Sequence, residues 1–132
     1  MGYEPFESAE ERTEMALALD LAQEPSHWTL TLVGELDYGE CAGFRMNIDR
    51  ILKSSPPATI VDLSGLTYLD SSGLGLLLAL SKEYTALGGR LVLVTNETVD
   101  NILSLTRLNG IFSTAASKQD ALAILGEPKP AQ

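Results

Sequence analysis

The spacing of the hydrophobic residues changes along this chain, and this change constrains the fold more than any other feature. From Met15 to Ala22 and from Trp28 to Glu35, apolar residues recur at every second position, as they do in β-strands. From Gly39 to Ser54 they recur at intervals of three and four, as on one face of an amphipathic helix. Because strand-like and helix-like stretches then continue to alternate, we expect an α/β domain.

The alternation runs through the rest of the chain. A short β-rich run at 59–61 is followed by turn residues at Ser64 and Gly65, so the sequence predicts that this strand ends there and that a loop follows. A leucine-rich stretch predicts a helix from Ser72 to Leu87, closed by two glycines. The later elements are a strand covered on both faces, a helix capped by Asn96, a short edge strand and a last helix, at 90–95, 97–105, 112–115 and 117–125.

The resulting order is β-β-α-β-α-β-α-β-α over residues 15–125. Strands separated by helices pair in parallel, whereas the first two strands are joined by a short turn and are expected to form an antiparallel hairpin. We therefore expect one domain with a mostly parallel mixed sheet and helices packed on it. Residues 1–14 hold five Glu and one Arg and are expected to be an acidic flexible leader, and residues 126–132 a flexible tail.

Composition excludes several classes of protein. The 132 residues are 45% hydrophobic and 20% charged, as in a folded domain with one core. A net charge of −9 gives no electrostatic attraction to nucleic acid or to an anionic membrane. The single cysteine, Cys41, cannot form an internal disulfide, and no apolar run approaches the roughly 20 residues of a membrane span. We expect a cytoplasmic protein that contacts neither nucleic acid nor membrane directly.

The sequence lacks the residue patterns of an enzyme. His27 is the only histidine and lies far in sequence from Ser71, so no base accompanies that serine. One Cys and one His do not make a zinc site, and there is no phosphate-binding loop with a Gly-Lys-Ser or Gly-Lys-Thr string. Cys41 is expected to be a small core residue. We therefore expect no catalytic residue, no metal and no cofactor.

Three short polar residues, Asp70, Ser71 and Ser72, stand directly before the leucine-rich helix. Each of these residue types can cap a helix by accepting hydrogen bonds from the free N–H groups of its first turn. One cap needs one residue, so the others are available for another role. The leucines of this helix also lie on more than one side of it; the extra ones either contact a neighbouring helix or form an apolar patch for a partner.

Two strings of residues carry a family resemblance. They are Ile60-Val61-Asp62-Leu63, followed by Leu69-Asp70-Ser71-Ser72-Gly73-Leu74-Gly75, and the turn Gly34-Glu35-Leu36-Asp37. Together they closely resemble the motifs of anti-sigma factor antagonists, which are single-domain members of the STAS family (sulphate transporter and anti-sigma factor antagonist). The order of strands and helices fits the STAS-type fold from Met15 to Leu125.

The resemblance implies a partner-switching cycle. An unphosphorylated antagonist binds an anti-sigma factor, a serine kinase with a histidine-kinase-like ATPase fold, and thereby frees a sigma factor. The kinase phosphorylates the first serine of the pair, here Ser71, and a metal-dependent serine phosphatase reverses the modification. Asp37 and Asp70 would shape the docking surface, with Ser72 as a neighbouring cap. The partner-binding residues implied are Asp37, Asp70, Ser71, Ser72, Gly73, Leu74 and Leu76.

Two other functions stay open at this point. The chain could be a STAS-domain scaffold or a subunit of a transport complex, although the serine at the acceptor position favours the switch. It could also be a nucleotide-binding protein or a weak phosphohydrolase that works at the end of the sheet where Asp37 and Asp70 lie.

Overall fold

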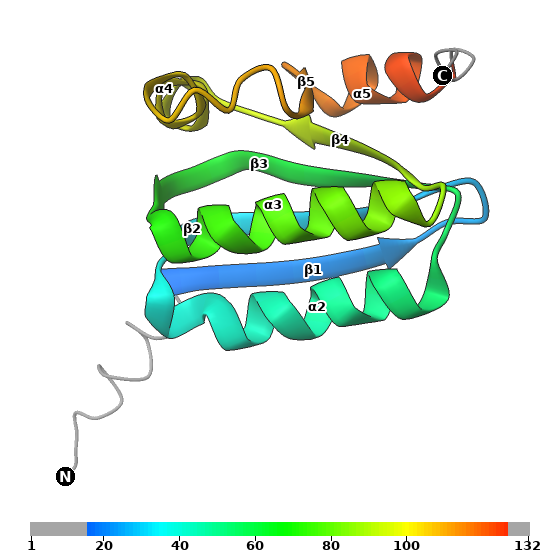
Figure 1. Ribbon diagram of the computed structural model, residues 1–132, viewed down its shortest axis with the longest axis horizontal. Coiled ribbons are helices and arrows are strands. Elements are labelled where there is room, and N and C mark those ends of the chain that lie inside the picture. Colours follow the sequence, from blue (N-terminus) through cyan, green and yellow to red (C-terminus); the bar gives the residue numbers. More distant parts are fainter. Residues whose placement is uncertain (1–15, 127–132) are drawn as a thin grey trace, which may run out of the picture.

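The computed structural model describes residues 16–126, which form a five-stranded mixed sheet with helices on both faces (Figure 1). The strands are β1 (Leu17–Gln23), β2 (Trp28–Leu36), β3 (Ala58–Leu69), β4 (Arg90–Val94) and β5 (Ser113–Ala115). The helices are the 3-10 helix η1 (Tyr38–Glu40), α2 (Cys41–Ser54), α3 (Ser71–Ala86), α4 (Glu97–Leu105) and α5 (Lys118–Leu125). The predicted α/β architecture is confirmed. The predicted leader and residues 127–132 of the predicted tail lie outside the described residues.

The strands lie in the order β1-β2-β3-β4-β5. β1 and β2 form the expected antiparallel hairpin, and the other neighbours pair in parallel. Leu17 at the start of β1 pairs with Gly34, and Leu36 at the end of β2 pairs with Leu69 at the end of β3. The carboxyl ends of β2 and β3 therefore meet at one edge of the sheet, and this edge carries the predicted site.

Strand β3 is longer than the sequence predicts. The prediction of a loop after Ser64 is wrong, because the strand continues to Leu69. The strand runs for 12 residues and pairs irregularly with β2 near this serine. The carboxylate of Asp62 accepts hydrogen bonds from the backbone N–H of Ser64 (3.0 Å) and from its hydroxyl (2.7 Å). Asn96 donates its side-chain amide to the carbonyl groups of Ser64 and Leu66, beyond the last pairing with β4. These bonds satisfy the backbone through the irregularity, so the strand continues.

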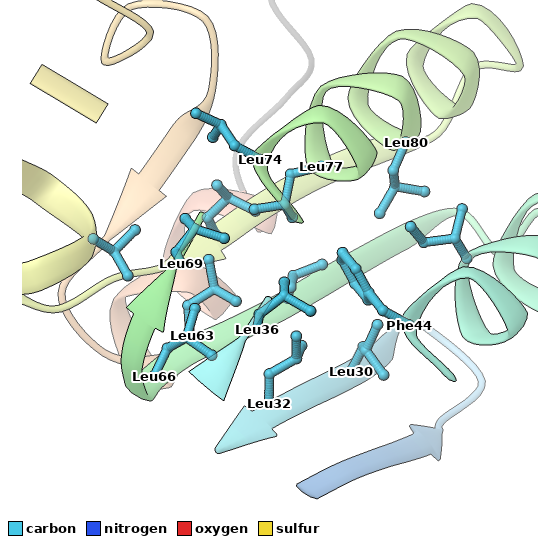
Figure 2. Packing of buried hydrophobic residues seen from close by; sticks show 14 of the residues in the cluster. Leu30, Leu32, Leu36, Phe44, Leu63, Leu66, Leu69, Leu74, Leu77 and Leu80 are labelled. Atoms are coloured by element: carbon cyan, nitrogen blue, oxygen red, sulfur yellow. The ribbon is translucent and has the colours of Figure 1, made fainter. Parts of the chain in front are cut away.

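Two hydrophobic cores lie on opposite faces of the sheet. The larger one lies under α2, α3 and α4, where side chains from the strands and helices point toward one another (Figure 2). Its fully buried members include Leu30, Leu32, Leu36, Phe44, Ile51, Leu63, Leu77 and Leu80. The smaller core lies under α5. Val92 and Val94 of β4 belong to the smaller core and Leu93 to the larger one, which explains the continuous apolar run of that strand.

Most leucines of α3 are used inside the domain. Leu74, Leu77 and Leu80 are buried, and the half-buried Leu76 and Leu78 pack against the larger core. Two hypotheses were open for the leucines outside the main apolar stripe, packing inside the domain or an apolar patch for a partner. The structure favours packing inside the domain. Within residues 16–126, no helix has both the length and the apolar character of a membrane span.

The carboxyl end of α3 is anchored by Tyr84. This side chain is fully buried, its hydroxyl donates to the carbonyl of Pro56, and it accepts a hydrogen bond from the hydroxyl of Thr59 (3.0 Å). Burial raises the pKa of Tyr84, partly offset by the bond from Thr59, so the phenol keeps the proton that it donates. A Cβ at Gly89 would lie 2.4 Å from the ring, so glycine is needed beneath it.

Candidate functional site

The site lies where β2 and β3 end side by side and each continues into a helix. Asp37 caps η1 by accepting a hydrogen bond from the backbone N–H of Glu40 (3.2 Å). Asp70 lies next to it: its Oδ2 accepts from the N–H of Tyr38 (3.2 Å), and its own N–H donates to the carbonyl of Leu36 (3.2 Å). These bonds tie the two strand-to-helix turns together, and Asp37 and Asp70 meet at one edge of the sheet as expected.

Asp70 is the N-cap of α3. Its Oδ1 accepts hydrogen bonds from the backbone N–H groups of Ser72 (3.0 Å) and Gly73 (3.2 Å). The expectation that Ser72 caps this helix is wrong, because Ser72 is already inside the first turn and Asp70 takes the free N–H groups. Ser71 is the first residue of the helix and is exposed, and its hydroxyl makes no hydrogen bond with any residue between 16 and 126. Ser71 is therefore accessible from solvent, and no described residue holds its hydroxyl.

Two residues expected to bind the partner, Gly73 and Leu74, are buried in the domain. A Cβ at Gly73 would lie 2.6 Å from the side chain of Leu36 and 2.9 Å from that of Leu69, so only glycine allows α3 to pack this closely on the sheet. Leu74 is only 7% exposed. Both residues support the position of Ser71 and are buried in the domain, whereas Leu76 is half-buried and keeps part of its side chain at the surface.

A shallow acidic hollow lies beside Asp70. It is lined by Glu35, Asp37, Tyr38, Gly39, Tyr68 and Asp70. Tyr38 is 80% exposed and Tyr68 is 49% exposed, so two aromatic rings border a surface with three carboxylates. Sequence reasoning missed Glu35, Tyr38 and Tyr68. Glu35 of β2 pairs with Tyr68 of β3. Tyr68 lies in the part of β3 that was predicted to be a loop, so the sequence did not predict that these two residues are neighbours.

Cys41 lies at the start of α2, close to the same carboxylates. It is half-buried, not a full core residue as expected, and its thiol donates a hydrogen bond to the carbonyl of Asp37 (3.3 Å). Burial raises the pKa of the Cys41 thiol, the carboxylates of Asp70 and Asp37 raise it further, and Arg45 partly opposes them. The thiol therefore stays protonated at neutral pH and helps to fix the turn after β2.

Comparison with known proteins identifies the family. The model of the STAS domain matches residues 18–121. The anti-sigma F factor antagonist of Lysinibacillus sphaericus is 30% identical over 92 residues, which cover 68% of this chain and 79% of that protein.

Several solved structures have a similar fold. The crystal structure of an anti-sigma factor antagonist from Mycobacterium paratuberculosis matches with a TM-score of 0.78 and 23% identity, over 84% of this chain and 95% of that one. The Bacillus cell fate determinant SpoIIAA in its phosphorylated form matches with a TM-score of 0.64 and 24% identity, over 81% and 99% of the two chains. Such antagonists are regulatory proteins and not enzymes, as the sequence led us to expect here. The chain belongs to the STAS domain family and, within it, to the anti-sigma factor antagonists.

Proposed function

We propose that this chain binds an anti-sigma factor while it is unphosphorylated, which frees a sigma factor, and that phosphorylation of Ser71 ends this binding. The proposed partner is a serine kinase with a histidine-kinase-like ATPase fold, which both binds the chain and phosphorylates it. A metal-dependent serine phosphatase would restore the binding form. The observation that carries the proposal is the exposed hydroxyl of Ser71, left free because Asp70 caps the helix.

Ser71 is better placed than its neighbour Ser72 to accept a phosphate. A kinase must bring the γ-phosphate into line with the attacking hydroxyl, which requires access from solvent. Ser71 is exposed, whereas Ser72 is half-buried. The hydrogen bonds of Asp70 to the first turn also hold Ser71 in a defined position, so the hydroxyl is presented without a preceding rearrangement.

The charges around Ser71 explain why a phosphate would release the partner. A phosphoserine carries about −1.5 to −2 charges at pH 7. In the free domain this charge would lie in solvent at a helix N-terminus, where the helix dipole stabilises it, so the fold tolerates it. In an interface the same charge would be desolvated next to the carboxylate of Asp70, which lowers affinity. Ser71 does not line the acidic hollow, so a basic side chain bound there would not pair with the phosphate.

The acidic hollow beside Asp70 favours a partner with basic side chains. Glu35, Asp37 and Asp70 supply three carboxylates, and cations also bind favourably over the exposed rings of Tyr38 and Tyr68. The same carboxylates disfavour the nucleotide-binding alternative, because the phosphates of a nucleotide would be repelled at this edge. No observation favours the alternative of a scaffold or a transport-complex subunit.

An in vitro phosphorylation assay tests the proposal. The purified chain is incubated with ATP and, in turn, with each purified histidine-kinase-like anti-sigma factor of the source cell, and phosphorylated residues are mapped by mass spectrometry. Ser71→Ala and Ser72→Ala form a matched pair of adjacent serines. We expect one kinase to phosphorylate the parent and Ser72→Ala but not Ser71→Ala. A phosphate on a different residue, or no phosphorylation by any of these kinases, would contradict the proposal.

A further inference from the structure

The first two turns of α3 contain two glycines in opposite surroundings. Gly73 has no room for a side chain, because a Cβ there would overlap the side chain of Leu36. Gly75 is exposed, and a Cβ built on it would have nothing within 4 Å. Its backbone is helical and its φ is not among the positive values of the described residues. Neither packing nor backbone conformation requires glycine at position 75.

Glycine at this position weakens the free domain. A glycine inside a helix loses more conformational freedom on folding than an alanine, and it leaves the backbone more exposed to water. The free domain would therefore be more stable with alanine at position 75. Natural domains often carry such suboptimal residues, so this glycine becomes informative only through its place beside Ser71.

Gly75 lies directly beside the proposed phosphoacceptor. Positions 71 and 75 are four residues apart in the helix, so they are neighbours on the same face, and both are exposed. The other residues three or four positions from Gly75 are Ser72, Leu78 and Ala79, and all three are half-buried. The missing side chain thus leaves a notch of bare backbone one turn beyond Ser71, with Leu78 and Ala79 on its carboxyl-terminal side.

We propose that the kinase that phosphorylates Ser71 packs an apolar side chain into this notch, against the bare backbone of Gly75. This inference rests on the proposed function, since any protein that reaches the hydroxyl of Ser71 must also cover the next turn of the same face. Interfaces pack as densely at their centre as protein interiors do, so one added methyl group would hold the partner away. Leu78 and Ala79 beside the notch match an apolar side chain better than a charged one.

A matched pair of alanine substitutions separates this role from a gain in helix stability. Gly75→Ala fills the notch, and Thr85→Ala changes an exposed residue of the same helix, ten positions beyond the notch. Both replace a poorer helix former by alanine, so both should raise the urea midpoint. Only Gly75→Ala should weaken binding to the purified kinase from the phosphorylation assay, by tenfold or more in calorimetry, and slow the phosphorylation of Ser71.

The possible results distinguish this inference from the function on which it rests. If the parent and Gly75→Ala bind the kinase equally well, the inference is overturned and the proposed function stands. If Gly75→Ala lowers the urea midpoint, the fold itself needs this glycine, and the inference is overturned as well. If no kinase binds the parent, the proposed function fails, and the inference fails with it.

Discussion

The two ends of helix α3 are held in opposite ways. At the carboxyl end the fully buried ring of Tyr84 fixes the helix against the core. At the amino end the carboxylate of Asp70 holds the backbone, and Ser71 remains exposed. Tyr84 lies 13 positions after Ser71, which separates these ends by about 20 Å along the helix. The apolar anchor therefore lies far from the end where a charge would be added, and the helix can accept that charge without losing its position.

Removal of the buried anchor should have the largest effect on stability. Tyr84→Ala should lower the free energy of unfolding by roughly 3–5 kcal/mol, because a large buried ring is lost and the carbonyl of Pro56 loses its donor. Urea denaturation of parent and variant measures this difference. The exposed Thr85, next to it in the helix, provides the control, since Thr85→Ala should raise stability slightly. Similar midpoints for the two variants would mean that Tyr84 is not the anchor.

At the amino end, the two glycines should respond with opposite signs. Gly73→Ala should destabilise the domain by about 1–3 kcal/mol, because its Cβ would overlap the side chains of Leu36 and Leu69. Gly75→Ala should stabilise it by up to about 1 kcal/mol, because its Cβ meets nothing. The same denaturation series measures both changes. Shifts of the same sign in the two variants would contradict the packing described for α3.

The loss of the cap should have a smaller effect. Asp70→Ala should lower the free energy of unfolding by about 1 kcal/mol, because the N–H groups of Ser72 and Gly73 lose their acceptor. Ser72→Ala should change it by less than about 0.5 kcal/mol. Thermal unfolding of the two variants compares them directly. If Ser72→Ala lowers the free energy of unfolding more than Asp70→Ala does, Ser72 and not Asp70 is the cap.

Much of this fold could be predicted from the sequence because hydrophobic period and capping residues agree along most of the chain. Helix α4 spans Glu97–Leu105 with Asn96 as its cap, as predicted, because a single strong cap precedes a clear helical pattern. The second half of β3 could not be predicted. Ser64 and Gly65 favour turns locally, and only hydrogen bonds from residues such as Asn96, distant in sequence, keep them in an extended strand.

The site could be predicted in part. Asp37 and Asp70 follow neighbouring parallel strands, so their meeting at one edge follows from the topology. The choice of Asp70 over Ser72 as the cap could not be predicted, because both residue types cap helices equally well and only the position of the first turn decides. The pairing of Glu35 with Tyr68, and with it the acidic hollow, depends on the unpredicted half of β3.

The most direct test of the proposed switch measures binding and stability on the same samples. Ser71→Asp adds a negative charge, and Ser71→Asn has nearly the same shape without the charge. We expect Ser71→Asp to weaken binding to the kinase at least a hundredfold in calorimetry, a loss of about 2.7 kcal/mol, while its urea midpoint stays at that of the parent. Ser71→Asn should bind far more tightly than Ser71→Asp. An unchanged dissociation constant for Ser71→Asp, or an equal loss for both variants, would contradict a switch that works through charge at Ser71.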